Sequence, residues 1–130
     1  MVCIIMDKII TRTATITLIK ESFVKMIMHE DAILDLQDMI DNHTAEQEIS
    51  NGKPHVILID TRANSMSSDE ARRYSSGEKP THYRIAVALL FNGLAGRIGA
   101  NSLINLYNPK VPTEKFIDEE KALQWLETFL

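Results

Sequence analysis

The sequence VILID at residues 56–60 is apolar on both sides of an extended chain and ends in Asp60. A second run of the same character, RIAVALLF, occupies residues 84–91. Strands that are apolar on both faces are typical of the middle of a parallel sheet that is covered by helices. We therefore predict that these two strands lie side by side in a single layer with helices on its faces.

The segment before these runs predicts a hairpin. In TATITLI, residues 13–19, threonines alternate with Ala14, Ile16 and Leu18, as in a half-buried strand. The run FVKMIMH at residues 23–29 fits its antiparallel partner. Its methionines either fill the core or line a soft apolar pocket; they are Met26 and Met28.

A helix is predicted next, because Ile33, Leu36, Ile40 and His43 recur at helical spacing. Asp31 is a plausible N-cap for it. On this prediction the apolar stripe, with His43 at its edge, packs against the sheet.

Three more helices and one short strand follow. SSDEARRYSS at residues 67–76 begins with a serine cap, and GLAGRIGANSLINLY at residues 93–107 is rich in small residues that suit close packing. EKFI at residues 114–117 is a short strand, and Asp118 caps the last helix. The predicted buried stripe of that helix consists of Ala122, Trp125, Leu126 and Phe129.

Together these elements predict one α/β domain over residues 1–130. It has a mixed sheet of about five strands with four helices, in the order β-β-α-β-α-β-α-β-α. Residues 1–12 form an apolar extension without the basic leader or cleavage site of a signal peptide. Its apolar side chains suit an edge strand, a self-association contact or a membrane-touching arm; they are Val2, Ile4, Ile5 and Met6.

Composition narrows the classes of function. The formal charge of −4 disfavours binding to a nucleic-acid backbone, and no run is long enough for an integral membrane segment. The single cysteine, Cys3, rules out an internal disulfide and fits a cytoplasmic location. The four histidines show no metal-ligand spacing, so we expect no metal and no cofactor.

Several strings resemble the anti-sigma-factor-antagonist fold, also called the STAS or SpoIIAA-like fold. They are VILIDTRANSMSSDEARRY, RIAVALLFNGLAGRIGANSLINLYNPKVPTEKFIDEEKALQWL and the alternating start. More narrowly, the chain resembles a bacterial group of stand-alone STAS/SpoIIAA-like (CRAL-TRIO-like) proteins, mostly of unknown function. The resemblance spans most of the chain from Thr13 onward and supports fold more strongly than activity.

The same resemblance implies a phosphoacceptor at the start of the helix that follows residues 56–60. Ser67 and Ser68 match that place, although Met66 and Asp69 replace the family's usual Asp and Gly. A simpler alternative is that one serine only caps the helix, since Asp69 and Glu70 suit its positive end. Both interpretations stay open at this point.

A ligand or partner face is predicted at the carboxyl ends of the two central strands, where α/β sheets place their sites. Asp60, Arg62, Asn92 and Arg97 are the candidates, with the serine pair nearby. Each of them also has a purely local role available, such as capping or bonding loop amides.

No nucleophile elbow or Ser/His/Asp set can be nominated, so we expect no enzyme activity and no catalytic residue. The resemblance favours a noncatalytic regulatory or protein-interaction module that binds a protein partner or forms a homo-oligomer. The alternative is a small carrier of an apolar or anionic ligand, related to CRAL-TRIO domains.

Overall fold

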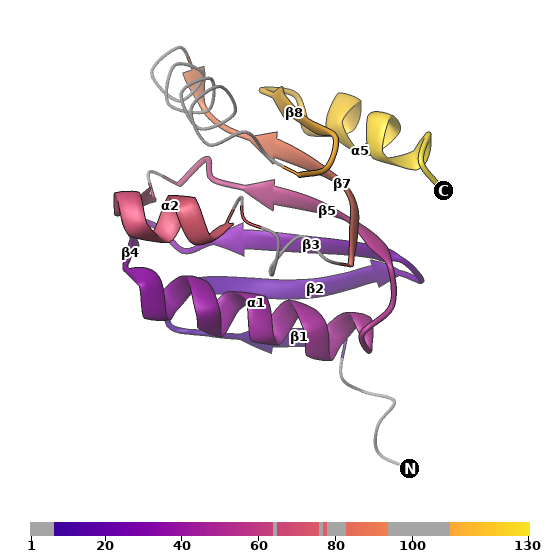
Figure 1. The fold of residues 1–130 in the computed structure, drawn as a ribbon. Coiled ribbons are helices and arrows are strands. Elements are labelled where there is room, and N and C mark those ends of the chain that lie inside the picture. Colours follow the sequence, from indigo (N-terminus) through magenta and orange to yellow (C-terminus); the bar gives the residue numbers. More distant parts are fainter. Residues whose placement is uncertain (1–6, 64, 76, 78–82, 94–109) are drawn as a thin grey trace.

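The computed structural model describes residues 7–63, 65–75, 77, 83–93 and 110–130. These residues form a six-stranded sheet in the order β1-β2-β3-β5-β7-β8, together with a separate two-stranded sheet, β4-β6 (Figure 1). The strands of the large sheet are β1 Lys8–Ile10, β2 Ala14–Lys20, β3 Phe23–Met28, β5 His55–Asp60, β7 Arg84–Leu90 and β8 Thr113–Phe116. The small sheet pairs β4 Ile33–Leu34 with β6 Met66–Ser67, and the described helices are α1 Leu36–Ser50, α2 Asp69–Ser75 and α5 Glu119–Glu127.

The predicted centre of the sheet is confirmed. β5 pairs with β7 in parallel, with Ile57 opposite Val87 and Asp60 opposite Leu90. β3 and β8 flank this pair, also in parallel, and the antiparallel hairpin of β2 and β3 leads to the edge strand β1. The sheet is therefore mixed, as the sequence predicted.

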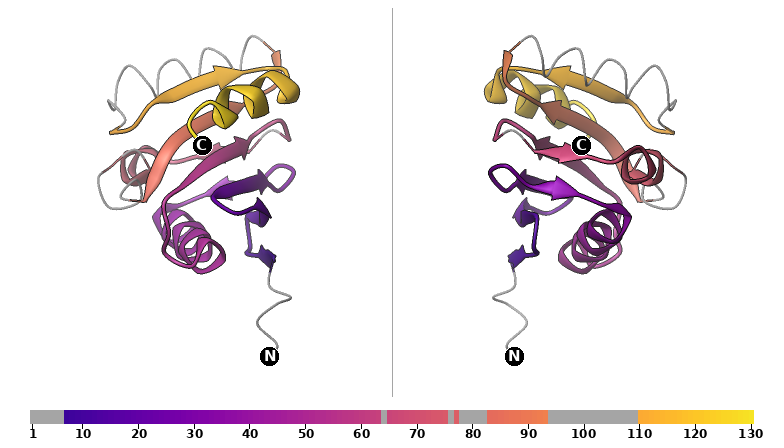
Figure 2. Two further views of the ribbon diagram at one scale, coloured as in Figure 1. Left: turned by 90° about the vertical axis from the view of Figure 1, so that its right-hand side faces the viewer. Right: turned by 90° about the vertical axis from the view of Figure 1, so that its left-hand side faces the viewer.

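Helices cover the two faces of the sheet on different halves (Figure 2). α1 packs on β1, β2 and β3, whereas α5 packs on β5, β7 and β8 from the opposite side. Because the strands alternate, β5 sends Ile57 to one cluster of buried side chains and Leu58 to the other.

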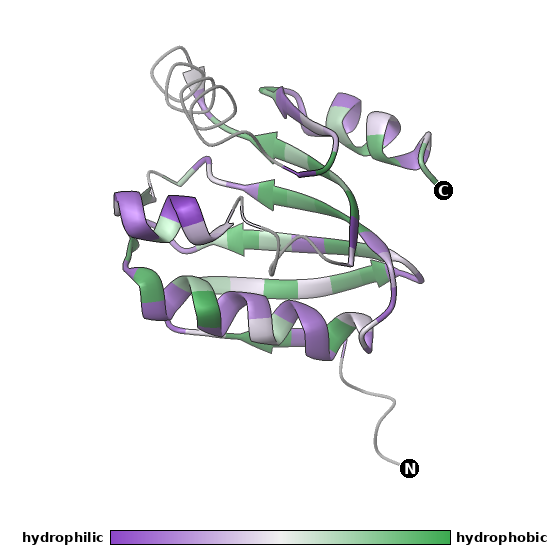
Figure 3. Cartoon of the chain, viewed as in Figure 1, coloured by the Kyte–Doolittle hydropathy of each residue, from purple (hydrophilic) through white to green (hydrophobic). Residues whose placement is uncertain are grey.

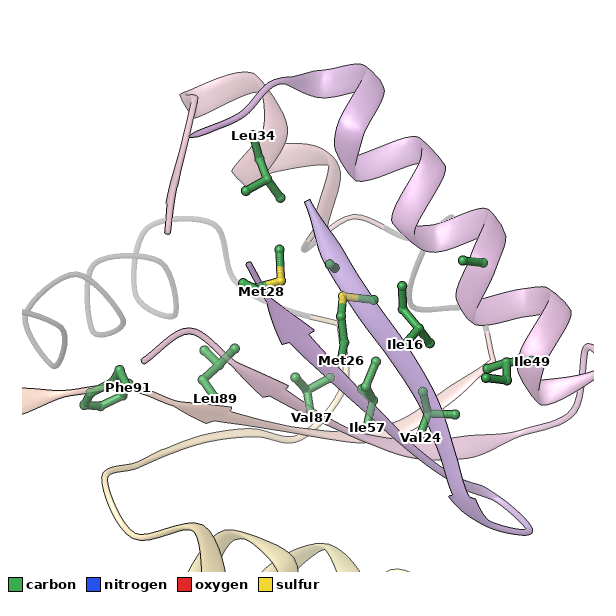
Figure 4. Close-up of a cluster of buried hydrophobic side chains, with 12 residues drawn as sticks. Ile16, Val24, Met26, Met28, Leu34, Ile49, Ile57, Val87, Leu89 and Phe91 are labelled. Atoms are coloured by element: carbon green, nitrogen blue, oxygen red, sulfur yellow. The ribbon is translucent and has the colours of Figure 1, made fainter. Parts of the chain in front are cut away.

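Met26 and Met28 belong to the cluster on the α1 side, together with Ile16 and Leu34 (Figure 4). Both methionines are buried, so the core-filling interpretation fits their position. On the other side, Ala122 and Leu126 of α5 are buried in the second cluster. Trp125 and Phe129 pack against that cluster while remaining partly exposed, so the predicted buried stripe is confirmed for Ala122 and Leu126 and only in part for the other two.

The start of the first helix was predicted wrongly. Ile33 and Leu34 form β4, and α1 begins only after Asp35, which caps it. Asp35 accepts a bond from the Asp38 amide, and the Asp38 side chain accepts one from the Asp35 amide, which together form a capping box. Asp31 instead lies in a turn with φ of 55°.

The buried face of α1 was also predicted wrongly. Leu36, Ile40 and His43 are only half-buried, and hydrophilic residues are interspersed with hydrophobic ones along the whole helix (Figure 3). The side facing the sheet carries a mixed set of polar and apolar residues, namely Asp38, Asn42, Ala45, Glu46, Ile49 and Ser50. Three of the polar groups have partners outside the helix. Asp38 bonds Arg12 and Asn42 bonds Thr13, both in the connection between β1 and β2, and Glu46 bonds Arg84 on β7.

The predicted numbers of elements also need correction. The large sheet has six strands because residues 8–10 of the N-terminal extension pair with β2 as an edge strand. Three helices occur in the described ranges, and the small-residue helix predicted at residues 93–107 falls almost wholly outside them. None of the three has the length and apolar character needed to cross a bilayer.

Candidate functional site

Asp60 and Arg62 form the centre of an ionic cluster at the carboxyl end of β5. Asp60 Oδ1 accepts bonds from the backbone amide and the Nε of Arg62, each at 3.0 Å, and Oδ2 accepts from Nη2 at 2.8 Å. Asp60 is buried, while the Arg62 side chain is 40% exposed. This fork-to-fork contact fixes the loop directly after the strand.

The cluster extends to the neighbouring strand and to the last helix. Arg62 Nη2 donates to Glu119 Oε1 at 2.8 Å, and Lys25 Nζ donates to Glu119 Oε2 at 2.7 Å. Lys25 lies on β3 and Glu119 is the first residue of α5. We call Lys25, Asp60, Arg62 and Glu119 the rim cluster.

The two carboxylates of the rim cluster are stabilised in their ionised forms by the neighbouring basic side chains. Burial would raise the pKa of Asp60, but the hydrogen bonds and the positive charge of Arg62 lower it below its ordinary value. The hydrogen bond from Lys25 is the main cause that lowers the pKa of Glu119. Neither carboxylate is thus poised to exchange a proton near neutral pH.

Asn92 joins the same end of the sheet. Its Nδ2 donates to the carbonyl oxygen of Arg62 at 3.2 Å, and Thr61 Oγ1 donates to the carbonyl of Leu90 at 2.9 Å. The structure therefore brings Asp60, Arg62 and Asn92 together, as the topology predicted. Arg97 lies outside the described residues.

The serine pair lies on the small sheet and at the start of α2. Ser68 Oγ accepts a bond from the Ala71 amide at 3.1 Å, which is the geometry of an N-cap. The Ser67 carbonyl accepts a bond from Arg72, whose side chain also pairs with Asp69. Ser68 thus fills the capping role expected from the sequence, and phosphorylation of either serine stays a prediction.

Two large apolar side chains stand exposed beside the serines. Ile33 and Met66 are opposite each other in the β4-β6 pair, and their relative exposures are 70% and 69%. Leu34 on the same short strand is buried, so the exposed pair is on the outer face of the small sheet. We call Ile33 and Met66 the outer pair.

A second ionic cluster, which sequence reasoning missed, is buried at the opposite end of the parallel strands. Glu46 on α1 accepts two bonds from Arg84, to Oε2 from Nε at 2.9 Å and to Oε1 from Nη2 at 2.7 Å. His55 Nε2 lies 2.6 Å from Glu46 Oε2, and His55 Nδ1 lies 2.8 Å from the Lys53 carbonyl oxygen. Both ring nitrogens of His55 thus face an oxygen atom.

Glu46 and His55 are fully buried, and Arg84 is nearly so. Burial would raise the pKa of Glu46, but the charge and hydrogen bonds of Arg84, together with the bond to His55, lower it to about 2. A sequence signal was present: each of the two most apolar strands begins with a basic residue, His55 and Arg84. The cluster fastens α1 to both strands and offers no surface for a substrate.

Comparisons with known proteins fit this architecture. Among solved structures, the chain is similar to an uncharacterised protein of the DUF3478 family with a SpoIIAA-like fold, from Shewanella loihica PV-4. The TM-score is 0.60 at 17% sequence identity, over 92% of this chain and 90% of that one. The class of protein that the fold defines is thus α/β and SpoIIAA-like. No curated protein matches the sequence.

A family model, described as Domain of unknown function (DUF7793), matches residues 17–130. The chain belongs to this family. The match begins within β2 and includes the rim cluster, the outer pair and the buried cluster.

Proposed function

We propose that this chain is a noncatalytic protein-interaction module of SpoIIAA-like fold that binds a protein partner through the outer pair. The observation that carries the proposal is the exposure of Ile33 and Met66 side by side on a sheet of only two short strands. Large apolar side chains that cluster on a surface beside polar residues are typical of protein contacts.

The state of the nearby charges supports a binding role over a catalytic one. Arg62 binds both Asp60 and Glu119, and the pKa of each of the three groups is shifted in the direction that favours its charged form. A general base or nucleophile needs the opposite, a group close to its titration point or beside a proton acceptor.

Site-specific photocrosslinking tests this function. A photoreactive phenylalanine analogue at position 66 is expected to capture a discrete partner in cells, and Ile33→Asp should abolish the product. As a control, Ile19→Asp changes another exposed isoleucine, on β2, and should leave the product unchanged. Both substitutions are at exposed positions, so each variant should keep its unfolding free energy within about 0.5 kcal/mol.

A product that survives Ile33→Asp, or is lost equally with Ile19→Asp, would contradict the proposal. The carrier alternative predicts a different result: an apolar or anionic ligand that stays bound in native mass spectrometry. Phosphorylation would appear in the same spectra as added mass, and fragmentation of the phosphorylated chain would show whether it is on Ser67 or Ser68.

A further inference from the structure

The surroundings of the outer pair are acidic, and this points to the chemistry of the partner. The segment that carries Ile33 and the segment that follows Met66 are rich in carboxylates, nearly all of them exposed. The carboxylates are Glu30, Asp31, Asp35, Asp38, Asp69 and Glu70.

Fewer positively charged side chains lie around the outer pair than carboxylates. Those whose contacts are described already form ion pairs. Arg12 pairs with Asp38 and also donates to the Ile33 carbonyl, while Arg72 pairs with Asp69. Arg73 brings the guanidinium groups to three, against six carboxylates. Within the described part of the chain, Glu30, Asp31 and Glu70 make no ion pair.

We propose that the partner presents an apolar side chain flanked by lysine or arginine residues, which bind the carboxylates around the outer pair. This inference rests on the proposed function and specifies its partner. Complementary charge at the edge of an apolar contact speeds association and rejects acidic competitors. Nucleic acids, anionic membranes and a second copy of this acidic face would all be repelled.

Panning a library of random 12-residue displayed peptides on the full chain tests the inference. Enriched peptides are expected to combine an apolar residue with adjacent lysine or arginine, and Met66→Asp should abolish their binding. The triple variant Glu30→Gln, Asp31→Asn, Glu70→Gln should weaken binding roughly tenfold at low salt. Raising the salt should weaken binding to the unaltered chain as well.

A matched control removes the same amount of charge elsewhere. Glu21, Glu48 and Glu114 are exposed, make no described side-chain bond and lie outside the two segments around the outer pair. Replacing all three with glutamine should leave peptide affinity unchanged. This control variant loses as much negative charge as the triple variant, but the loss is not beside the outer pair.

The possible failures are distinguishable. Two results would overturn the inference and leave the proposed function standing. One is that the enriched peptides need Met66 but are neutral or acidic. The other is that they bind the triple variant as tightly as the control variant. Absence of any Met66-dependent peptide would overturn both. If sedimentation shows a homodimer that Met66→Asp dissociates, the outer pair binds a second copy of this chain, and the proposal of a basic partner is wrong.

Discussion

Glu46 places a negative charge in the interior, where the charge is tolerated only because Arg84 and His55 surround it. Glu46→Gln leaves the Arg84 guanidinium buried without a counter-charge. We expect a loss of about 3–5 kcal/mol in unfolding free energy, measured by urea denaturation at neutral pH. Glu48→Gln, two residues further along the helix and exposed, should change it by less than about 0.5 kcal/mol.

The same residue predicts how stability depends on pH. The pKa of Glu46 is about 2 in the folded chain, against an ordinary value of 4.5. A lowered pKa contributes stability that is fully present above 4.5 and is lost as the pH falls from 4.5 towards 2. The lowered pKa values of Asp38, Asp60 and Glu119 act in the same direction.

Denaturation series from about pH 6 to about pH 3 should therefore show declining stability, with a shallower decline in Glu46→Gln than in the unaltered chain. Equal slopes in the two proteins would show that folding does not lower the pKa of Glu46.

Buried charged residues such as Glu46 limit how well a sequence predicts the buried face of a helix. Periodicity favoured Ile40 and His43 as the packed side of α1, because apolar residues usually face the core. The helix instead turns Glu46 inward, because Arg84 and His55 bind its carboxylate there from two neighbouring strands, and Arg84 is distant from it in sequence. Only the three-dimensional pairing makes a buried carboxylate favourable.

Among the elements, α1 has the most informative boundary. Asp35→Ala removes the side chain that bonds the Asp38 amide, so we expect a loss of about 1 kcal/mol. Asp31→Gly should cost less than about 0.5 kcal/mol or stabilise, because glycine readily adopts the φ of 55° found there. Thermal or urea unfolding of both variants measures the difference, and the reverse ranking would restore Asp31 as the cap.

The longer strands were predictable, and the two-residue strands were not. β2, β3, β5 and β7 each carry an alternating or continuous apolar pattern that is long enough to recognise. β4 and β6 contain two residues each, too few to show any period, and they exist because the turn at Asp31 brings residues 32–34 beside residues 66–68. The outer pair was consequently missed.

At the scale of the molecule, the rim cluster fastens the last helix to the centre of the sheet. Glu119→Gln loses the charge that both Lys25 and Arg62 bind. We expect about 1 kcal/mol of destabilisation that shrinks at high salt, and faster hydrogen exchange in α5 than elsewhere. Glu120→Gln, beside it but exposed, removes an equal charge from the same helix terminus and controls for the helix dipole.

The overall architecture followed from the two apolar strands, and the meeting of Asp60, Arg62 and Asn92 followed from their common direction. Function did not follow in the same way. A binding surface depends on which side chains are left uncovered, and that depends on every contact around them. Ile33 is apolar in a segment patterned like a helix, and only its place in β4 exposes it.

The division of the interior by the sheet has a consequence for how the family can diversify. Leu126 and Met28 are separated by a layer of backbone, so enlarging or shrinking one leaves the surroundings of the other nearly unchanged. Mutational drift beneath α5 can thus proceed without shifting the small sheet, whose Leu34 is anchored in the opposite cluster. Relatives with a remodelled C-terminal helix should retain the same small sheet and outer pair.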